Sequence, residues 1–336
     1  MTENYSLDTM GAQSALNKSW HLMDHALSKL SARPSYEILN YGAADGGTSM
    51  DYFKKVFQRL DGALLHYTAN DLPLNDFNTL ARNLDVLRAE FENLSVFIQP
   101  SSFYFNVARK GSVDIALAAT TMHWLSQVPC RAIGHLHANK VEGDIRDQFR
   151  TQALEDFDHL LALRAFEFRR GGHLIMVDLA EGMAGDFLGS NGTDLDMFDT
   201  LYSLWEELFN DKLITLETFE YALIQNYYKT GKEVQQVLSL PHQMENWKVH
   251  SLSTRTTPCP YRTQFDYDGD VDSFAEGLMK TIRSWSRHSF LEAVLKTGGN
   301  PSVVDHFFTR LQKRISQDPK RFSMDYTHNY IHLERL

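Results

Sequence analysis

The first half of the chain alternates between short apolar runs and longer segments with apolar residues at helical spacing. Apolar residues every three or four positions over 14–30 predict a helix, and the same spacing predicts helices near 48–60 and 76–90. Between these segments, short apolar runs predict strands at 36–41, 64–69, 94–99 and 113–119. The last of these runs is apolar enough for a strand that is buried on both faces.

An amphipathic segment at 144–168 predicts a further helix, which the pair Gly171-Gly172 is expected to end before a strand at 173–177. Strands that alternate with helices in this way favour parallel pairing, because each parallel connection needs a crossover helix. The expected fold class is therefore α/β, with a Rossmann-like, doubly wound and mostly parallel sheet.

After Glu181 the pattern changes. Four glycines between 182 and 192 indicate a loose linker, residues 194–224 and 272–316 each predict two helices, and 247–252 and 326–333 predict late strands. We interpret the helical stretches as a cap over the active edge of the sheet. The expected organisation is an N-terminal helical segment (1–30), an α/β core (31–185) and a C-terminal part (186–336), whose cap occupies about 190–230 and 270–318 and whose late strands complete the core sheet.

Composition narrows the class of protein. Lys and Arg number 33 against 43 Asp and Glu, so the net charge is −10, and a basic nucleic-acid-binding surface is disfavoured. Two cysteines, Cys130 and Cys259, are too few for a disulfide framework or a four-cysteine zinc site. No apolar run approaches the roughly 20 residues that span a bilayer, and the start MTENYSLDTM lacks signal-peptide features. We therefore expect a cytoplasmic protein without a membrane partner.

Candidate chemistry first appears where the predicted strands end. A glycine loop at 42–47 follows the first strand, with Thr48 or Ser49 expected to cap the next helix. Asp71 ends the second strand, where a carboxylate can accept both hydroxyls of an adenosine ribose. Position alone allows a second interpretation equally well, in which Asp71 only caps the turn before Pro73. Walker A and Gly-x-Ser-x-Gly patterns are both missing from the sequence.

Two long segments then resemble a known family. Residues 70–78, NDLPLNDFN, resemble the NDLPGNDFN segment of the SABATH methyltransferases, and residues 123–129 match their HWLSQVP segment. Shorter matches keep the same order: Ser102-Phe103-Tyr104, Glu155-Asp156-Phe157, and Arg164 with Glu167. This family contains the salicylate, jasmonate and indole-acetate carboxyl methyltransferases. The resemblance extends from about residue 36 to 180 and is weak in the C-terminal half.

The resemblance implies a class I methyltransferase fold with S-adenosylmethionine (SAM) as cofactor and a small carboxylic acid as acceptor. In the core, Asp71 would bind the ribose, Leu72 would pack near the adenine, Ser102 and Phe103 would hold the adenine, and Gly42 would pass under the methionine portion. Trp124 would donate its indole N–H to the acceptor carboxylate, with His123 and Thr120 beside it in the acceptor pocket. Family members are often homodimers, so a homodimer is also implied.

Three departures from the family pattern suggest a divergent member. The family's acid in the first loop is Asn40 here, with Asp45 further along, and the tyrosine before the HWLSQVP segment is Thr120. The N-terminal Y…NS..Q pattern has a partial counterpart in Ser14 and Asn17, with Met10 in the tyrosine's place. Asn17 would then replace the glutamine that holds the acceptor carboxylate, and Ser14 would join the cofactor-binding residues.

The expected reaction needs no general base. A carboxylate has a pKa near 4, so it is already ionised at pH 7 when it attacks the methyl group of the SAM sulfonium. Catalysis then depends on in-line placement of oxygen, methyl and sulfur, with Trp124 and Asn17 as the orienting residues. Two alternatives remain open: an N-methyltransferase of a small heterocycle, for which His123 is a candidate base, and a SAM-binding protein without turnover.

Metal sites are the weaker interpretation. His21 with His25 and His135 with His137 have spacings compatible with metal pairs, but no third ligand follows at a matching interval, which favours surface or packed histidines. The resemblance places Asn139 where some family members contact Mg²⁺, with Glu217 or Glu220 as partner. We expect no resident metal.

Overall fold

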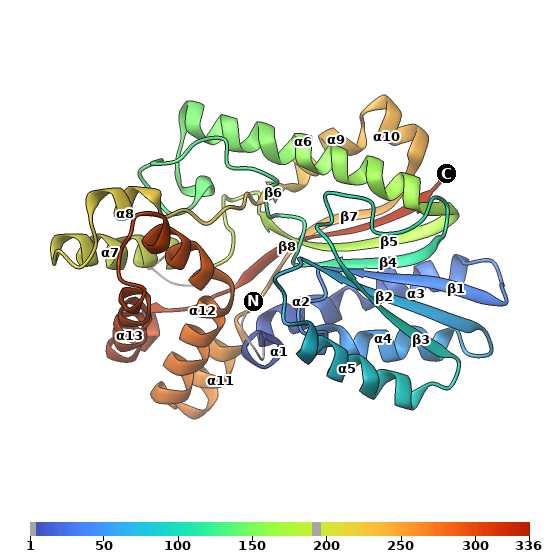
Figure 1. Cartoon of the computed structure of the whole chain (residues 1–336), viewed down its shortest axis with the longest axis horizontal. Helices are drawn as coiled ribbons and strands as arrows, with labels where there is room; N and C mark the ends of the chain where they lie inside the picture. Colours follow the sequence, from blue (N-terminus) through green and yellow to red (C-terminus); the bar gives the residue numbers. More distant parts are fainter. Residues whose placement is uncertain (1–4, 190–195) are drawn as a thin grey trace.

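Seven strands form a sheet in the order β3-β2-β1-β4-β5-β8-β7, and a short eighth strand, β6, pairs with β5 (Figure 1). The computed structural model describes residues 5–189 and 196–336. Neighbours from β3 to β5 are parallel, whereas β8 runs antiparallel to both β5 and β7. The strands are β1 (Ser35–Tyr41), β2 (Leu64–Asp71), β3 (Leu94–Pro100), β4 (Val113–Ala119), β5 (Phe168–Glu181), β6 (Lys229–Thr230), β7 (Trp247–Thr257) and β8 (Tyr326–Arg335).

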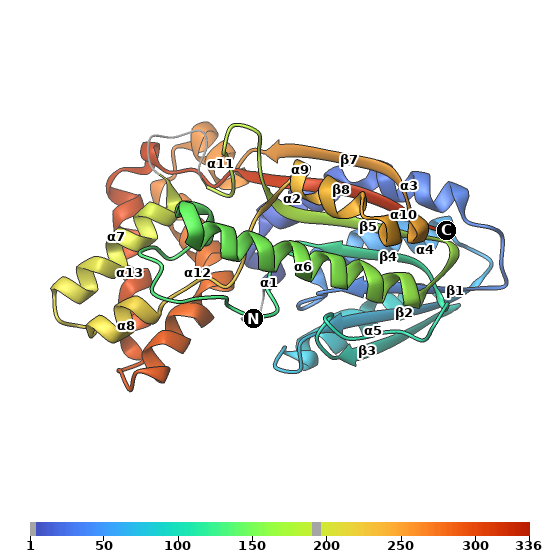
Figure 2. The same ribbon diagram turned by 90° about the horizontal axis from the view of Figure 1, so that it is seen from above.

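Helices cover both faces of this sheet (Figure 2). On one face, Phe53 and Val56 of α4 pack against Ile38 and Ile115 of the central strands. On the other face, α6 and α9 pack against alternate residues of the same strands. The helices that flank the sheet are α2 (Met10–Lys18), α3 (Trp20–Lys29), α4 (Gly47–Arg59), α5 (Phe77–Glu90), α6 (Gly143–Glu167), α9 (Gly231–Leu238) and α10 (Pro241–Asn246).

A separate group of helices lies at one end of the sheet, around the apolar cluster that Trp205, Phe290 and Phe307 form (Figure 1). This group contains α7 (Met197–Asn210), α8 (Leu216–Tyr221), α11 (Pro260–Asp268), α12 (Val271–Lys296) and α13 (Ser302–Gln317). The one-turn helix α1 (Tyr5–Asp8) and the 3-10 turns Ala138–Lys140 and Pro319–Arg321 complete the described elements. In the described part of the chain, no helix combines the length and apolar character that crossing a bilayer requires.

The expected α/β class, with a mostly parallel sheet and late strands added at its edge, is confirmed. The helix expected over 14–30 is wrong in detail, because α2 and α3 meet at Ser19. The Ser19 hydroxyl donates to the Leu16 carbonyl at 2.7 Å and lies 2.9 Å from the Tyr52 hydroxyl, which fixes the turn between the two helices.

Two further local expectations are wrong. Gly171-Gly172 does not end the preceding helix, because α6 stops at Glu167 and both glycines lie inside β5, where a Cβ on Gly172 would come within 2.8 Å of the Val113 carbonyl of β4. Neither Thr48 nor Ser49 caps α4. Its N-cap is Gly46, with φ of 78°, and the Ser49 hydroxyl accepts from the Asn40 amide at 3.0 Å.

Candidate functional site

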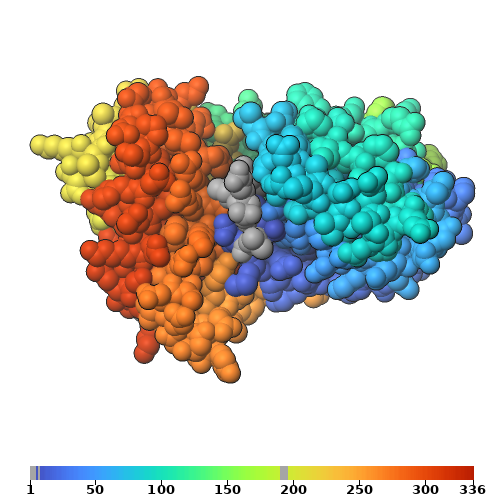
Figure 3. All heavy atoms as spheres, turned by 60° about the horizontal axis from the view of Figure 1, so that its bottom comes forward, coloured from blue at the N-terminus to red at the C-terminus, as the bar shows by residue number. Residues whose placement is uncertain are grey.

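A cavity of about 470 Å³ lies at the C-terminal ends of β1, β2 and β4. Ligands of open α/β sheets bind at this edge, and the volume is in the range of small-molecule sites. The cavity reaches from the loop after β1 to residues of α1, α2 and α12. Figure 3 shows the corresponding division of the surface, with the blue-to-cyan first half on one side and the orange and red C-terminal helices on the other.

The loop after β1 forms the floor of the cavity and requires glycine. Gly42 has φ of 72°, and a Cβ added there would lie 2.3 Å from the Thr121 hydroxyl oxygen. The backbone N–H groups of Gly42 and Ala43 both donate to the Asn70 carbonyl at 2.9 Å. These bonds tie the loop to the end of β2 and leave room for a ligand against the backbone.

Asp71 closes β2 and faces the same cavity. Its Oδ2 accepts from the Ala44 N–H at 2.7 Å, and its Oδ1 accepts from the Leu72 N–H at 2.8 Å. Burial raises the pKa of the Asp71 carboxyl, and the two backbone donors oppose that rise. The carboxylate therefore caps the turn before Pro73, as one of the two interpretations predicts. It also lines the cavity, where the ribose-binding interpretation expects it.

The segment after β3 is held by a buried ion pair. Ser102 and Phe103 line the cavity. Arg164 and Glu167 of α6 are 2.9 Å apart and fully buried, and the guanidinium donates to the carbonyls of Phe103 and Phe105 at 2.9 Å. Burying such a pair is favourable only when its hydrogen bonds are satisfied. The Arg164–Glu167 motif therefore positions the Ser102-Phe103 segment.

Trp124 and Thr120 come after β4 and also line the cavity. The Trp124 carbonyl accepts from the Tyr104 hydroxyl at 2.7 Å, and its ring lies 5.3 Å from that of His288. Within the described residues, the Trp124 indole N–H has no hydrogen-bond partner. Thr120 has φ of 53°, an unfavourable conformation for a β-branched residue, and such conformations concentrate at functional sites.

His123 lines the cavity from within a buried charge network. Its Nδ1 lies 3.1 Å from Asp178 Oδ1, and Lys229 Nζ lies 3.2 Å from Asp178 Oδ2. Burial lowers the pKa of His123, although Asp178 acts in the opposite direction. Burial pushes the pKa of Asp178 up, but Lys229 and His123 together hold it below its usual value. The imidazole is therefore neutral at pH 7 and stays in a fixed orientation.

The structure does not bring Ser14 or Asn17 to the cavity. Asn17 is exposed on α2, and neither residue is part of the lining. Tyr5, Thr9 and Ala12 line the cavity instead, at the same intervals of four and three residues that separate Met10, Ser14 and Asn17. The spacing of the family motif therefore predicts the intervals between the lining residues correctly. The residues assigned to it lie five positions too far along the chain.

Asn40 and Asp45, which depart from the family pattern in the first loop, both have defined hydrogen-bond partners. Asn40 lines the cavity and uses both amide hydrogens, one to Ser49 and one to the Tyr67 hydroxyl at 3.1 Å. Asp45 is not part of the lining. Its carboxylate accepts from the Ser6 N–H and hydroxyl, both at 2.8 Å, and so fastens α1 to the loop after β1.

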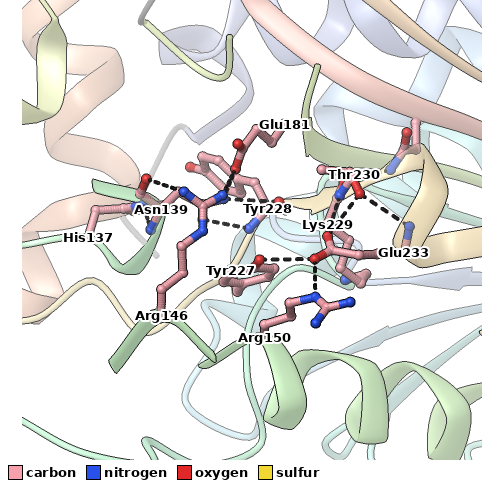
Figure 4. Close-up of polar contacts among 11 residues, drawn as sticks. His137, Asn139, Arg146, Arg150, Glu181, Tyr227, Tyr228, Lys229, Thr230 and Glu233 are labelled. Atoms are coloured by element: carbon pink, nitrogen blue, oxygen red, sulfur yellow. Dashed lines mark hydrogen bonds and ion pairs between the residues drawn. The ribbon is translucent and has the colours of Figure 1, made fainter. Parts of the chain in front are cut away.

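Asn139 supports the wall of the cavity through its side-chain amide (Figure 4). The amide accepts from the Tyr228 N–H at 2.9 Å and donates to Glu181 Oε2 at 2.7 Å. Tyr228 lines the cavity, whereas Glu217 and Glu220 are exposed on α8. Asn139 therefore orients the segment before β6, and the structure does not pair it with Glu217 or Glu220 as a magnesium site.

Sequence reasoning missed the contribution of α12. Thr281, Ser284, Trp285 and His288 of this helix line the cavity. Their spacing of three, one and three residues is that of one helical face. The pattern was present in the sequence, but which face of a helix meets a distant strand edge depends on tertiary packing.

An aspartate closing the second strand, a glycine loop beside it and this strand order define the fold of class I SAM-dependent methyltransferases. The structure of loganic acid methyltransferase with SAH shares the fold, with a TM-score of 0.78 over 98% of this chain and 96% of that one at 19% identity. The family model described as SAM dependent carboxyl methyltransferase matches residues 51–336, so the chain belongs to this family and uses SAM as its methyl donor.

The curated relatives are methyltransferases as well. The chain is 27% identical over 268 residues to O-methyltransferase acrG of Aspergillus aculeatus, covering 76% of this chain and 69% of that protein. It is 22% identical over 374 residues to jasmonate O-methyltransferase of Arabidopsis thaliana, covering 94% and 91%. Indole-3-acetate O-methyltransferase 1 of the same plant is 27% identical over 248 residues, covering 64% and 63%.

Proposed function

We propose that the protein transfers the methyl group of SAM to the carboxylate of a small, partly apolar carboxylic acid, giving a methyl ester and S-adenosylhomocysteine. One observation carries this proposal: the same cavity is lined by Asp71, by the glycine loop and by Trp124, whose indole N–H has no hydrogen-bond partner among the described residues. A donor site and an acceptor site that share one cavity are what direct methyl transfer needs.

At the donor end, the 31–185 core binds SAM. Asp71 accepts the ribose hydroxyls, since each carboxylate oxygen keeps acceptor capacity beyond its one backbone bond. Leu72, Ser102 and Phe103 hold the adenine. Gly42 leaves space for the methionine portion, and Asn40 takes the place of the family's acid beside it.

At the acceptor end, the indole N–H of Trp124 donates to one carboxylate oxygen and leaves the other free to attack. Thr120 and the neutral His123 shape the pocket around this group. Thr9 and Ala12 of the 1–30 segment, rather than Ser14 and Asn17, face the acceptor. The cap within 186–336 supplies the wall for the rest of the acid, with Trp285 of α12 among its lining residues.

The chemistry follows from charge. The attacking carboxylate is ionised at pH 7, and its negative charge and the positive sulfonium neutralise each other as the methyl group moves. Because no proton is transferred, the protein's contribution is orientation and exclusion of water, and orientation alone can supply several kcal/mol. Trp124 therefore acts by positioning the acceptor oxygen.

Replacing Trp124 with Phe tests this role. An aromatic ring remains, although smaller than the indole, and the N–H is lost, so the acceptor KM should rise and kcat should fall, with kcat/KM reduced about tenfold for the loss of one hydrogen bond to a charged group. SAM affinity, measured by calorimetry, should stay at the wild-type value. Weakened SAM binding together with unchanged acceptor kinetics would contradict the assignment.

The paired His123 and Asp178 support a second candidate, N-methylation of a small heterocycle. A neutral imidazole oriented by a carboxylate can accept a proton from an N–H acceptor. A screen of carboxylic acids and heterocycles with labelled SAM shows which class of compound is methylated. The pH dependence of the rate then separates the two mechanisms, because only N-methylation predicts a rate that falls as His123 becomes protonated. SAM binding without turnover on either panel would instead support a binding protein that lacks chemistry.

The assembly and compartment expected from the family resemblance, a homodimer in the cytoplasm, form the remaining part of the proposal. Light scattering on the purified chain tests the dimer, and microscopy of the tagged chain tests the compartment. A small-molecule acid is the proposed partner, and neither nucleic acid nor a membrane surface is part of the proposal.

A further inference from the structure

Three histidines from neighbouring strands gather at the end of the sheet away from the cavity. His173 lies in the first half of β5, His332 near the end of the antiparallel strand β8, and His250 in β7. One ring nitrogen from each lies within 4.8 Å of those of the other two. The ligand cavity is at the opposite, C-terminal end of β5.

A bulge brings the third ring to this face. β7 and β8 pair in register up to Val249, but the register shifts by one residue before Ser251, so that His250 is the extra residue. The bulge places the His250 ring 4.7 Å from the His332 ring, nearly parallel to it. Bulges commonly redirect a side chain next to a functional site.

Two of the three rings, those of His173 and His332, are buried. A buried ring nitrogen needs a partner, which a neighbouring polar group, a water or an ion can supply. His173 Nδ1 and His332 Nε2 lie at a hydrogen-bond distance of 3.0 Å, and the other ring nitrogen of His332, Nδ1, is buried with no hydrogen-bond partner among the described residues.

Three more groups lie beside the cluster. Glu334, two residues after His332, accepts from His250 Nε2 at 2.6 Å and so orients that ring, as carboxylates do beside metal-binding imidazoles. His25, exposed on α3, places its ring 5.4 Å from both His250 and His332. Lys248 is the nearby cation, 3.4 Å from Glu334.

We propose that His173, His250 and His332 form a binding site for one Zn²⁺ ion, which His25 closes from the solvent side. Imidazole nitrogens suit zinc, which binds them at about 2.0–2.1 Å in tetrahedral geometry, with ligand atoms therefore roughly 3.3 Å apart. The His173 and His332 nitrogens already have nearly this separation, and rotation of the His250 and His25 rings brings in the other two. The ion ties α3 to three strands and stabilises the fold, remote from methyl transfer.

Metal titration of the purified chain, with any affinity tag removed and metal stripped by chelator, tests the site. Co²⁺ replaces Zn²⁺ as a spectroscopic probe, because a tetrahedral nitrogen site gives visible absorption. We expect one Co²⁺ per chain, displaced by Zn²⁺, and a melting temperature that rises with added Zn²⁺. His250→Gln should weaken Co²⁺ binding at least tenfold and remove the Zn²⁺ effect on melting, and His25→Gln should weaken binding less.

His21→Gln is the matched control, since His21 lies on the same helix as His25, its Nδ1 contacts the Lys18 carbonyl at 2.9 Å, and it is not part of the three-histidine cluster. That variant should bind Co²⁺ as the wild type does. Wild-type binding no tighter than that of His250→Gln, or no visible bands at saturation, would overturn the proposal and identify the cluster as packed neutral imidazoles. SAM affinity should be equal in all these variants, so the result is independent of the proposed function.

Discussion

Asp71 caps the turn before Pro73, and the same side chain is the proposed partner of the SAM ribose. We predict that Asp71→Asn lowers SAM affinity at least tenfold, because a neutral amide replaces a carboxylate that accepts two ribose hydroxyls, and hydrogen bonds to charged groups contribute about 1.5–3 kcal/mol each. Calorimetry with SAM measures the change.

Asp76→Asn is the matched control for that prediction. Asp76 lies five residues further along and caps α5 by accepting from the N–H groups of Asn78 and Thr79. It is not part of the cavity lining, so its replacement should leave SAM affinity unchanged. Equal SAM affinity in wild type and Asp71→Asn would remove the ribose role.

At residue scale, the segments with long motifs were predictable. Asp71, Ser102, Phe103 and Trp124 all line the cavity, as expected. Asp71 is the last residue of β2, and the other three follow the ends of β3 and β4 within five residues. The carboxyl ends of parallel strands share one edge of the sheet. Asn17 was not predictable in the same way, because its assignment rested on a short pattern that fits the N-terminal segment of α1 and α2 in more than one register.

At the scale of elements, the orientation of α2 determines which of its residues line the cavity that we propose holds the acceptor. Ala12 occupies the position that corresponds in spacing to the family's glutamine. We predict that Ala12→Gln lowers the acceptor KM by about tenfold, since the new amide can donate one hydrogen bond to the carboxylate. Steady-state kinetics with the acid identified by screening measure it.

The exposed residue Asn17 provides the comparison for Ala12→Gln. Asn17→Ala should leave KM, kcat and SAM affinity unchanged. A raised acceptor KM in Asn17→Ala, with no effect of Ala12→Gln, would return the acceptor contact to Asn17 and contradict the observed orientation of the helix.

The start of α9 offers a test of element stability (Figure 4). Thr230 and Glu233 form a capping box: the Thr230 hydroxyl accepts from the Glu233 N–H at 3.2 Å, and the Glu233 carboxylate accepts from the Thr230 N–H at 2.7 Å. Thr230→Ala should reduce the free energy of unfolding by about 1 kcal/mol, as measured by urea denaturation. Lys232→Ala, exposed in the same turn, should change it by only a few tenths.

Buried histidines give the whole molecule an acid-sensitive stability. Burial lowers the pKa of His137 to about 3 and that of His328 to about 4, against about 6.5 in an unfolded chain. Between these values the unfolded state binds more protons, so the free energy of unfolding falls as pH decreases from about 6.5, by up to about 1.4 kcal/mol per pH unit for each histidine.

Urea denaturation at pH 8, 6 and 5 measures that decline. The contribution of these groups to the free energy of unfolding should be constant between pH 8 and 7. It should then fall steadily as the pH is lowered further. His328→Gln should flatten the slope between pH 6 and 5 relative to the wild type. A wild-type stability that does not change between pH 8 and 5 would show that these histidines are not held neutral by the fold.

The sequence by itself determined the alternation of strands and helices, the cofactor loop and the family, because these depend on periodicity and on residues close together in the chain. Only the tertiary structure decided which faces of α2 and α12 line the cavity and that His25, His173, His250 and His332 meet. Those contacts join residues far apart in sequence, and packing of the sheet and its helices sets them, including one bulge in β7 that local patterns do not encode.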